Sequence, residues 1–364
     1  MKKILLLIAF LGLAAAGSAA DDATVFREGE EGYASFRIPV IIRTAGGTLL
    51  AFCEGRKQGR KDSGDIDLVM KRSDDGGHTW GALSVVWDDK ENTCGNPAPV
   101  WDEQAGKVVL VCTWNDGRDQ ESKIWAQQSI DTRRVFVTES ADEGLSWSPA
   151  REITPCVKLP SWGWYATGPC HAIQLRKTGR LVVPCNHSEH QATHSHLIYS
   201  DDHGQTWHLG AVQRETGGNE STVAELRDGR LMLNMRMYGH REEHPCRAYL
   251  VSEDGGLTFS GDMRFAEALI EPVCQGSLLS LKRPCGRPTK KLLFCNPAST
   301  MRRENMQVKL STDGGTSWNI LTTIFAGKAA YSDMVQLDKR TVGVLFECGQ
   351  KSCYEKIVFR RIKI

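Results

Sequence analysis

The sequence predicts an all-β fold, a six-bladed β-propeller of four-stranded antiparallel sheets. Three observations support this prediction. One turn motif occurs five times, and a second pattern, a turn followed by an apolar stretch, occurs six times. The 364 residues without a 20-residue leader leave 344, or about 57 for each of six units, which suits a blade of four short strands. A seven-bladed arrangement is the alternative.

The turn motif reads Ser-x-Asp-x-Gly-x-Ser/Thr-aromatic, and we expect it to close a hairpin. Its Asp carboxylate can accept hydrogen bonds from the backbone N–H groups that follow it, and its Gly can adopt a conformation that other residues resist. The aromatic side chain can then pack between neighbouring units, so the motif is structural. The copies lie at residues 73–80, 140–147, 200–207, 252–259 and 311–318, and the strand-like runs before them at residues 68–72, 135–138, 197–199, 248–251 and 308–310.

The second pattern gives the count of six. Each apolar stretch follows a polar or glycine turn, as expected for a strand that begins after a hairpin. Neither a long helical pattern nor a linker rich in Pro or Ser interrupts the series, so residues 21–364 are expected to form a single propeller domain. The six stretches lie at residues 47–52, 106–110, 179–183, 229–233, 290–294 and 340–344.

Residues 1–20 have the features of a secretory signal peptide. Lys2 and Lys3 give a positive start, residues 4–16 are apolar, and Ser18-Ala19-Ala20 supplies small residues for cleavage. The apolar stretch is shorter than the roughly 20 residues that span a bilayer; an uncleaved anchor is the alternative. We therefore expect an exported protein, periplasmic or secreted, without a membrane span.

The charge balance argues against a nucleic-acid partner. The full chain has a net charge of +1 at pH 7, and loss of the two leader lysines reverses its sign. No overall basic field is therefore present to hold a polyanion. Any anion that the protein binds must be held by a local group of side chains.

Twelve cysteines allow disulfides if the protein is exported. Cys112, however, follows the apolar run at residues 108–111, which is typical of a buried thiol. Cys348 and Cys353 are close enough in sequence to bridge across a hairpin, and the sequence leaves that pairing open.

Four histidines lie within ten residues, at positions 187, 190, 194 and 196. No carboxylate or cysteine completes a familiar metal-ligand spacing around them, so we interpret this segment as a polar connecting loop. The Asp-rich turns do not match the EF-hand spacing, and there is no Cys-x-x-Cys pair. We expect neither a metal nor an organic cofactor.

Together with the repeated turns, five segments resemble the exo-α-sialidases, or neuraminidases, of bacteria and animals. The resemblance covers nearly all of residues 21–364. It implies the same propeller fold and a substrate with a terminal sialic acid, whose carboxylate is attached to the anomeric carbon. The segments are Phe36-Arg37-Ile38-Pro39, Phe52-Cys53-Glu54-Gly55-Arg56, Trp164-Tyr165-Ala166-Thr167-Gly168-Pro169, Asn219-Glu220-Ser221 and Tyr331-Ser332-Asp333.

The resemblance implies that three arginines hold the substrate carboxylate. Guanidinium groups suit this task because they donate hydrogen bonds in a rigid fork. Arg37 occupies the Phe-Arg-Ile-Pro position, Arg236 ends an apolar strand and Arg303 precedes another strand. Arg302, next to Arg303, is the alternative for the third position.

The resemblance also implies a tyrosine nucleophile, Tyr331. A neutral phenol avoids the repulsion that a carboxylate nucleophile would meet from the substrate's own carboxylate, and sialidases are the tyrosine exception among glycosidases. Glu220 would accept the phenol proton. Glu225 is the competitor, but it stands just before the Asp228-Gly229 turn and is typical of a solvated edge residue.

Asp62, six residues after Arg56, is the expected general acid and base. Its place in a loop would let it reach over the mouth of a pocket. Asp65 and Asp67 are its rivals.

Three positions are expected around these groups. Glu347 matches a family glutamate that orients the first arginine, and Arg56 is expected to frame the pocket near the 4-position of the sugar. Trp164 and Tyr165 are candidates for the pocket lining.

The function that the resemblance implies is hydrolysis of terminal α-linked sialic acids, with retention, through a tyrosyl-enzyme intermediate. Partners would be sialylated oligosaccharides, glycoproteins or glycolipids. The alternatives are transfer to another sugar, intramolecular release of an anhydro sugar, a preference for a deaminated sialic acid, and a propeller that binds sialosides without cleaving them.

Overall fold

The computed structural model describes residues 22–364, so the expected leader lies outside the described residues. Strands dominate the fold and the two helices are single turns, which confirms the all-β prediction. The elements are β1 (Asp22–Arg27), β2 (Ser35–Arg43), β3 (Leu49–Arg56), β4 (Ile66–Ser73), β5 (Ser84–Trp87), β6 (Thr93–Asp102), β7 (Lys107–Asn115), α1 (Glu121–Trp125), β8 (Arg134–Ser140), β9 (Arg151–Glu152), α2 (Thr154–Val157), β10 (Trp162–Thr167), β11 (Ile173–Gln174), β12 (Leu181–Glu189), β13 (Ala192–Ser200), β14 (His208–Val212), β15 (Gly218–Glu225), β16 (Leu231–Met237), β17 (Cys246–Ser252), β18 (Ser260–Ile270), β19 (Ser277–Lys282), β20 (Pro288–Pro297), β21 (Glu304–Ser311), β22 (Asn319–Gln336), β23 (Thr341–Gly349) and β24 (Lys356–Lys363).

Within residues 22–364, these strands form four sheets rather than the six separate sheets that were predicted. The difference arises because neighbouring antiparallel meanders share pairing. In the eight-stranded sheet, β2–β5 and β6–β9 are joined by one parallel pair, Ile66 with Thr93. In the seven-stranded sheet, the 18-residue β22 pairs with β21 through its first half and with β23 through its second half. The remaining sheets contain β10–β14 and β15–β18.

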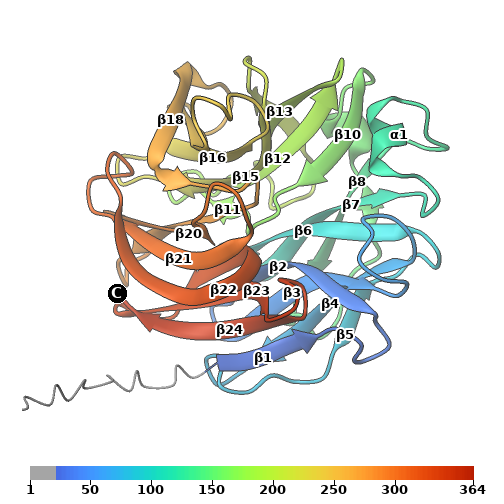
Figure 1. Cartoon of the computed structure of the whole chain (residues 1–364), viewed down its shortest axis with the longest axis horizontal. Coiled ribbons are helices and arrows are strands. Elements are labelled where there is room, and N and C mark those ends of the chain that lie inside the picture. Colours follow the sequence, from blue (N-terminus) through green and yellow to red (C-terminus); the bar gives the residue numbers. More distant parts are fainter. Residues whose placement is uncertain (1–21) are drawn as a thin grey trace, which may run out of the picture.

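The sheets lie around the middle of the molecule in chain order (Figure 1). One strand from each of the six meanders makes contact with its counterpart in the next: β2 with β6, β6 with β11, β11 with β15, β15 with β19, β19 with β22, and β22 with β2. Strand β1 pairs antiparallel with β24 and so joins the first described strand to the last. A closed ring of strand contacts therefore surrounds the centre.

The turn motifs have the hairpin role that the sequence predicted. In the first copy, Asp75 accepts hydrogen bonds from the backbone N–H of Thr79 at 2.9 Å and from its hydroxyl at 2.6 Å. The Ser73 hydroxyl accepts the N–H of Gly77, whose φ is +90°. Trp80 then packs edge-on against Phe359 of β24, with ring centroids 5.4 Å apart. Each motif thus closes a hairpin and delivers an aromatic ring to the neighbouring unit.

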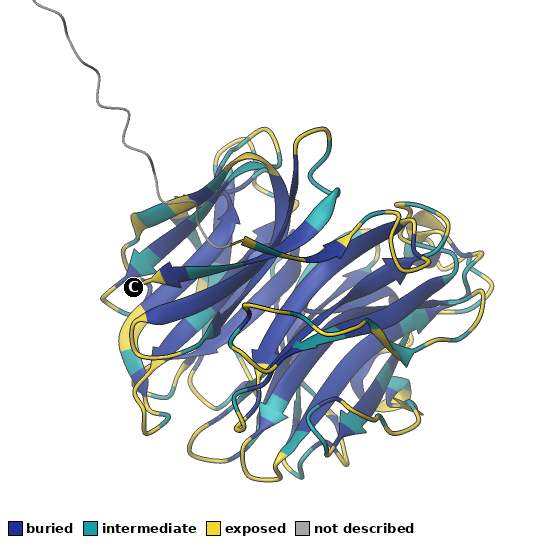
Figure 2. Ribbon diagram, turned by 90° about the horizontal axis from the view of Figure 1, so that it is seen from below, coloured by how far each residue is buried: buried dark blue, intermediate teal, exposed yellow. Residues whose placement is uncertain are grey.

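Burial follows the strands, whereas the exposed residues gather in the connections (Figure 2). All residues of β3, which has strands on both sides, are buried. Cys112 is a buried thiol as predicted, and Cys348 and Cys353 are not bridged. Within residues 22–364, no helix is long and apolar enough to cross a membrane.

The histidine segment is not a polar loop, so that interpretation was wrong. His187 lies on β12, and His194 and His196 lie on the paired strand β13. His187 stacks on Trp162 at 3.4 Å between ring centroids, and its Nδ1 lies 3.0 Å from Nδ1 of His196. Burial strongly lowers the pKa of His187 and lowers that of His196 to about 3. Stacking and hydrogen bonding among neutral rings allow them to replace apolar core residues here.

Candidate active site

A polar cavity of about 280 Å³ lies at one end of the strand ring. Residues in the first part of β2, β6 and β15 line this cavity, together with Tyr331 of β22. Because these strands stand side by side around the centre, corresponding positions on them meet at the same end. Seven sequence-predicted site residues line this cavity: Arg37, Arg56, Asp62, Glu220, Arg236, Arg303 and Tyr331.

Three guanidinium groups surround the ring of Tyr331. The guanidinium carbons of Arg37 and Arg303 lie 5.0 Å and 5.5 Å from its centroid, and Arg236 Nη1 donates to its hydroxyl at 3.1 Å. Arg302, the alternative to Arg303, is exposed and does not line the cavity. Three guanidinium groups around one small cavity are an arrangement suited to holding an anion there.

Glu347 of β23 positions the first arginine and the phenol together. One carboxylate oxygen accepts Nε of Arg37 at 2.7 Å and the N–H of Ile38 at 3.0 Å, and the other accepts the N–H of Tyr331 at 3.1 Å. Ile38 has φ +62°, which is unfavourable for a β-branched residue. The fully buried carboxylate therefore fixes this bulge of β2 against β22 and leaves the terminal nitrogens of Arg37 directed toward the cavity.

Tyr331 and Glu220 form a direct hydrogen bond. The phenol donates to Glu220 Oε1 at 2.6 Å, and Arg236 Nη1 donates to Glu220 Oε2 at 2.5 Å. Burial, together with the Glu220 charge, raises the pKa of Tyr331 well above its usual value, although Arg236 and Arg303 oppose the shift. The phenol is therefore protonated at rest, and an acceptor for its proton is already in contact with it.

Asp62 projects from the loop between β3 and β4 into the cavity mouth. Its side chain is 60% exposed and contacts Arg56 Nη2 at 2.7 Å. Desolvation favours the neutral carboxyl, but the charges of Arg56 and Arg37 outweigh it and lower the pKa of Asp62. Its rivals are engaged elsewhere: Asp67 accepts the Tyr33 hydroxyl at 2.6 Å, and Asp65 pairs with a lysine at 2.9 Å.

Two expectations about neighbouring residues were wrong. Tyr165 does not line the cavity, whereas Trp164 does, because successive side chains on β10 point to opposite faces. Tyr165 is fully buried against His196. Glu225 is not a solvated edge residue: it is only 8% exposed and accepts the N–H of Arg176 at 3.2 Å.

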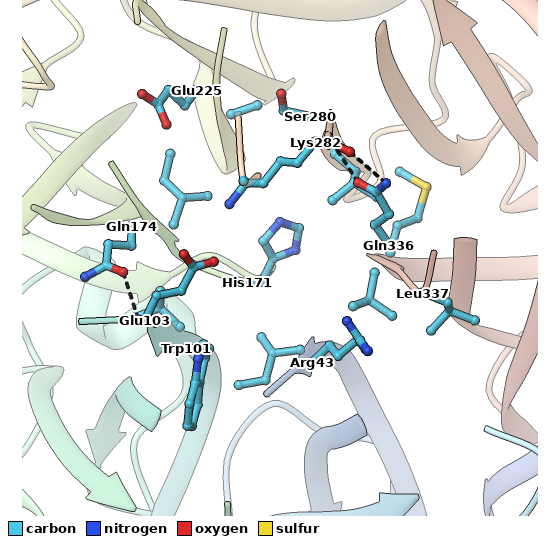
Figure 3. A pocket seen from close by; sticks show the side chains of 18 of the residues that line it. Arg43, Trp101, Glu103, His171, Gln174, Glu225, Ser280, Lys282, Gln336 and Leu337 are labelled. Atoms are coloured by element: carbon cyan, nitrogen blue, oxygen red, sulfur yellow. Dashed lines mark hydrogen bonds between the residues drawn. The ribbon is translucent and has the colours of Figure 1, made fainter. Parts of the chain in front are cut away.

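Glu225 faces a second cavity, of about 710 Å³, which is lined by later residues of β2, β6, β15 and β22 (Figure 3). The two cavities therefore lie at opposite ends of the same strands. His171 projects into the second cavity and contacts Asp333 through Nδ1 at 2.8 Å. None of the three predicted clamp arginines lines it, so the predicted chemistry belongs to the smaller cavity.

Several cavity residues escaped the sequence interpretation. Glu54 accepts Nε and Nη2 of Arg56 at 3.0 and 2.6 Å, and its place in the Phe-Cys-Glu-Gly-Arg segment was the available signal. No local motif marks the others, which come together only in the fold. They include Asn96, Glu121, Arg133, Tyr238 and Tyr354.

The sequence and fold are similar to those of known sialidases. Residues 47–344 match the family described as BNR repeat-like domain. The chain is 31% identical over 367 residues to the exo-alpha-sialidase of Aspergillus fumigatus (strain ATCC MYA-4609 / CBS 101355 / FGSC A1100 / Af293), a match that covers 92% of this chain and 85% of the relative. The chain belongs to the sialidase family.

Two further comparisons agree with this assignment. This sialidase-family chain is 31% identical over 354 residues to a sialidase of Bacteroides fragilis (strain YCH46), covering 92% of the chain and 63% of that relative. It thus spans less than two thirds of that protein. The structure called Hadza microbial sialidase Hz136 matches with a TM-score of 0.84 at 30% identity, covering 94% of this chain and 68% of the other. The family inferred from the motifs is confirmed.

Proposed function

We propose that this sialidase-family protein is an exo-α-sialidase that hydrolyses terminal α-linked sialic acids with retention of configuration. The observation that carries the proposal is the Tyr331–Glu220 hydrogen bond of 2.6 Å in a cavity lined by Arg37, Arg236 and Arg303. The substrates are sialylated oligosaccharides, glycoproteins or glycolipids.

Binding begins with the substrate carboxylate. Arg37, Arg236 and Arg303 hold it by charge and by paired N–H donors, which places the anomeric carbon above the phenol oxygen of Tyr331. The ion pairs of Arg37 with Glu347 and of Arg236 with Glu220 keep two of these guanidinium groups in place before substrate arrives. Little reorganisation is then needed at the moment of reaction.

In the first chemical step, Tyr331 attacks the anomeric carbon while Glu220 takes the phenol proton. The bond from that carbon to the leaving oxygen breaks, and Asp62 gives its proton to this oxygen. A tyrosyl–sialoside bond results. The positive charge that develops on the sugar is stabilised by the negative charge that moves from Glu220 to the phenolic oxygen as the proton is transferred.

In the second step, Asp62 takes a proton from water and the oxygen of that water attacks the anomeric carbon. The bond to Tyr331 breaks, and the phenolate recovers its proton from Glu220. Two displacements at one carbon leave its configuration unchanged. The side chains return to their starting protonation states.

The six antiparallel meanders are, in this proposal, the six blades of a propeller. The closed ring of strand contacts and the β1–β24 pairing support it. We further propose export to the periplasm or the medium, on the strength of the leader-like sequence of residues 1–20.

A fluorogenic sialoside and NMR of the released sugar test the function. The α-anomer is expected as the first product and should precede mutarotation. Release of the β-anomer first would contradict retention, an anhydro sugar or a transfer product would favour those alternatives, and binding by folded protein without turnover would favour a sialoside-binding protein.

A further inference from the structure

Asn96 lies at the bulge in β6 and presents its amide to the active-site cavity. Its φ is +50°, a conformation that Asn tolerates better than most residues but that still costs free energy. Its backbone N–H donates to Glu54 at 2.9 Å, and its carbonyl accepts the Thr167 hydroxyl at 2.5 Å. These contacts hold the strained backbone in place.

The side-chain oxygen of Asn96 is held separately. It accepts hydrogen bonds from Arg133 Nη2 and, at 3.3 Å, from the hydroxyl of Thr113. An amide that uses its oxygen in this way must turn its NH₂ group in the other direction. Within residues 22–364, that nitrogen has no partner, and Asn96 lines the cavity.

Arg133 is buried among uncharged partners. Besides Asn96, its guanidinium donates to the Asn115 side chain at 2.6 Å and to the Thr113 hydroxyl at 2.9 Å, and it stacks on Trp164 at 3.9 Å. Burial lowers the pKa of Arg133 to about 10, so it is still charged at neutral pH. Burying a cation without a hydrogen-bonded carboxylate costs desolvation free energy. The charge of Arg133 therefore does not serve the stability of the fold.

Lys158 fixes the backbone around this cation. Its side-chain nitrogen donates to the carbonyls of Arg133 and Gly163, each at 2.8 Å. The residue after Gly163 is Trp164, whose ring covers the guanidinium. The segment carrying Arg133 and the segment carrying Trp164 are thus tied together behind the cavity wall.

We propose that Arg133 is a positioning residue for substrate recognition: it locks the amide of Asn96 so that the NH₂ group donates to an oxygen of the sugar. The inference rests on the proposed function. The charges that act most strongly on Arg133 are those of Glu54, Glu121, Asp62 and Arg56, and Arg56 is the residue expected near the 4-position of the sugar. The oxygen that Asn96 meets therefore belongs to the part of the ring remote from the carboxylate.

A double-mutant cycle tests this proposal. KM and kcat for a fluorogenic sialoside are measured for Asn96→Ala, Arg133→Gln and the double variant. Arg134→Gln serves as the control, because this neighbouring arginine is half-buried and does not line the cavity. A contact to a non-reacting part of the sugar acts mainly on KM. Each single variant is expected to raise KM about tenfold with kcat little changed, and the double variant should be no worse than either.

If the KM increases of the two single variants multiplied in the double variant, to about 100-fold, the two residues would act independently and the inference would be overturned. Asn96→Asp keeps an oxygen for Arg133 but removes the NH₂ donor, so it should fold and still raise KM about tenfold. Unchanged KM in that variant would also overturn it. A wild-type protein without sialoside turnover would contradict the proposed function instead.

Discussion

The phenol oxygen of Tyr331 lies 2.6 Å from Oε1 of Glu220, across 111 residues of sequence. Both groups also contact Nη1 of Arg236. Because burial raises the pKa of Tyr331 well above its usual value, a free phenolate is not available near neutral pH. In the proposed mechanism, nucleophilic attack must therefore coincide with proton transfer to Glu220, and the nearby guanidinium groups would offset the negative charge that develops on the phenol oxygen.

Replacing Tyr331 by Phe removes the oxygen that forms the covalent bond and little else. We expect kcat/KM for a fluorogenic sialoside to fall by about 10³-fold or more, with the melting temperature within a few degrees of wild type. Binding of free sialic acid should persist, because the three arginines are intact. Near-wild-type turnover in this variant would exclude Tyr331 as the nucleophile.

Replacing Arg37 by Lys keeps the positive charge but loses the planar fork. Arg37 donates from Nε to Glu347 at 2.7 Å and keeps its terminal nitrogens for the cavity. Lysine has a single side-chain nitrogen, so it cannot make both contacts. We expect affinity for sialic acid, measured by calorimetry, to fall about 100-fold. Arg302→Lys, beside the clamp but exposed, is the matched control and should bind as wild type. Equal binding by both variants would remove Arg37 from the clamp.

The role of general acid that we propose for Asp62 depends on the cations beside it. Desolvation favours its neutral form, and the charges of Arg56 and Arg37 more than cancel this and lower its pKa. Arg56→Gln removes one cation, so the pKa of Asp62 should rise and the carboxyl should keep its proton to higher pH. In the plot of kcat/KM against pH, the alkaline limb is expected to move to higher pH, whether or not the maximum rate changes.

Arg27→Gln, at an exposed position at the end of β1, serves as the control for that pH profile and should leave it in place. A limb that stays fixed or moves downward in Arg56→Gln would show that Asp62 is not the acid.

Lys158 makes stability depend on pH. Burial, with a smaller effect of Arg133, lowers its pKa to about 7. Between that pH and the ordinary lysine pKa, the unfolded chain binds a proton that the folded chain lacks, so the free energy of unfolding rises with pH through this window. One such proton contributes at most about 1.4 kcal/mol per pH unit.

Lys158→Met should flatten this rise, as measured by denaturant unfolding at pH 7, 8.5 and 10. Lys177→Met, at an exposed turn, is the control and should keep the wild-type slope. Identical slopes in all three proteins would mean that Lys158 remains charged when buried.

The parts of the fold that follow local rules could be predicted from sequence. The Ser73–Trp80 turn is an example, since the Asp75 and Gly77 conformations depend on residues within the motif itself. The number of separate sheets could not be predicted in this way, because it depends on whether two meanders exchange a pair such as Ile66 with Thr93.

The candidate site likewise contains some residues that could be predicted from the sequence and others that could not. Tyr331, Glu220 and Arg37 could be predicted because each lies in a segment that resembles the sialidases, whereas Arg236 and Arg303 were predicted only from their positions at the ends of strands. Arg133 lies between Thr132 and Arg134 with nothing to distinguish it from a surface arginine. Only the fold shows that Arg133 is buried in the cavity wall and that Arg134 is not. The histidines at 187 and 196 were misread because polarity was taken as exposure, whereas stacking with Trp162 buries them.

Covalent trapping tests the central claim most directly. A sialic acid with fluorine at C3 and fluoride as leaving group at the anomeric carbon should slow the second step more than the first, and the protein should gain the mass of one fluorosugar. Peptide mass spectrometry should place that mass on Tyr331, with no labelling of Tyr331→Phe. Label on another residue, or an inactivated enzyme without a covalent adduct, would contradict the tyrosyl mechanism.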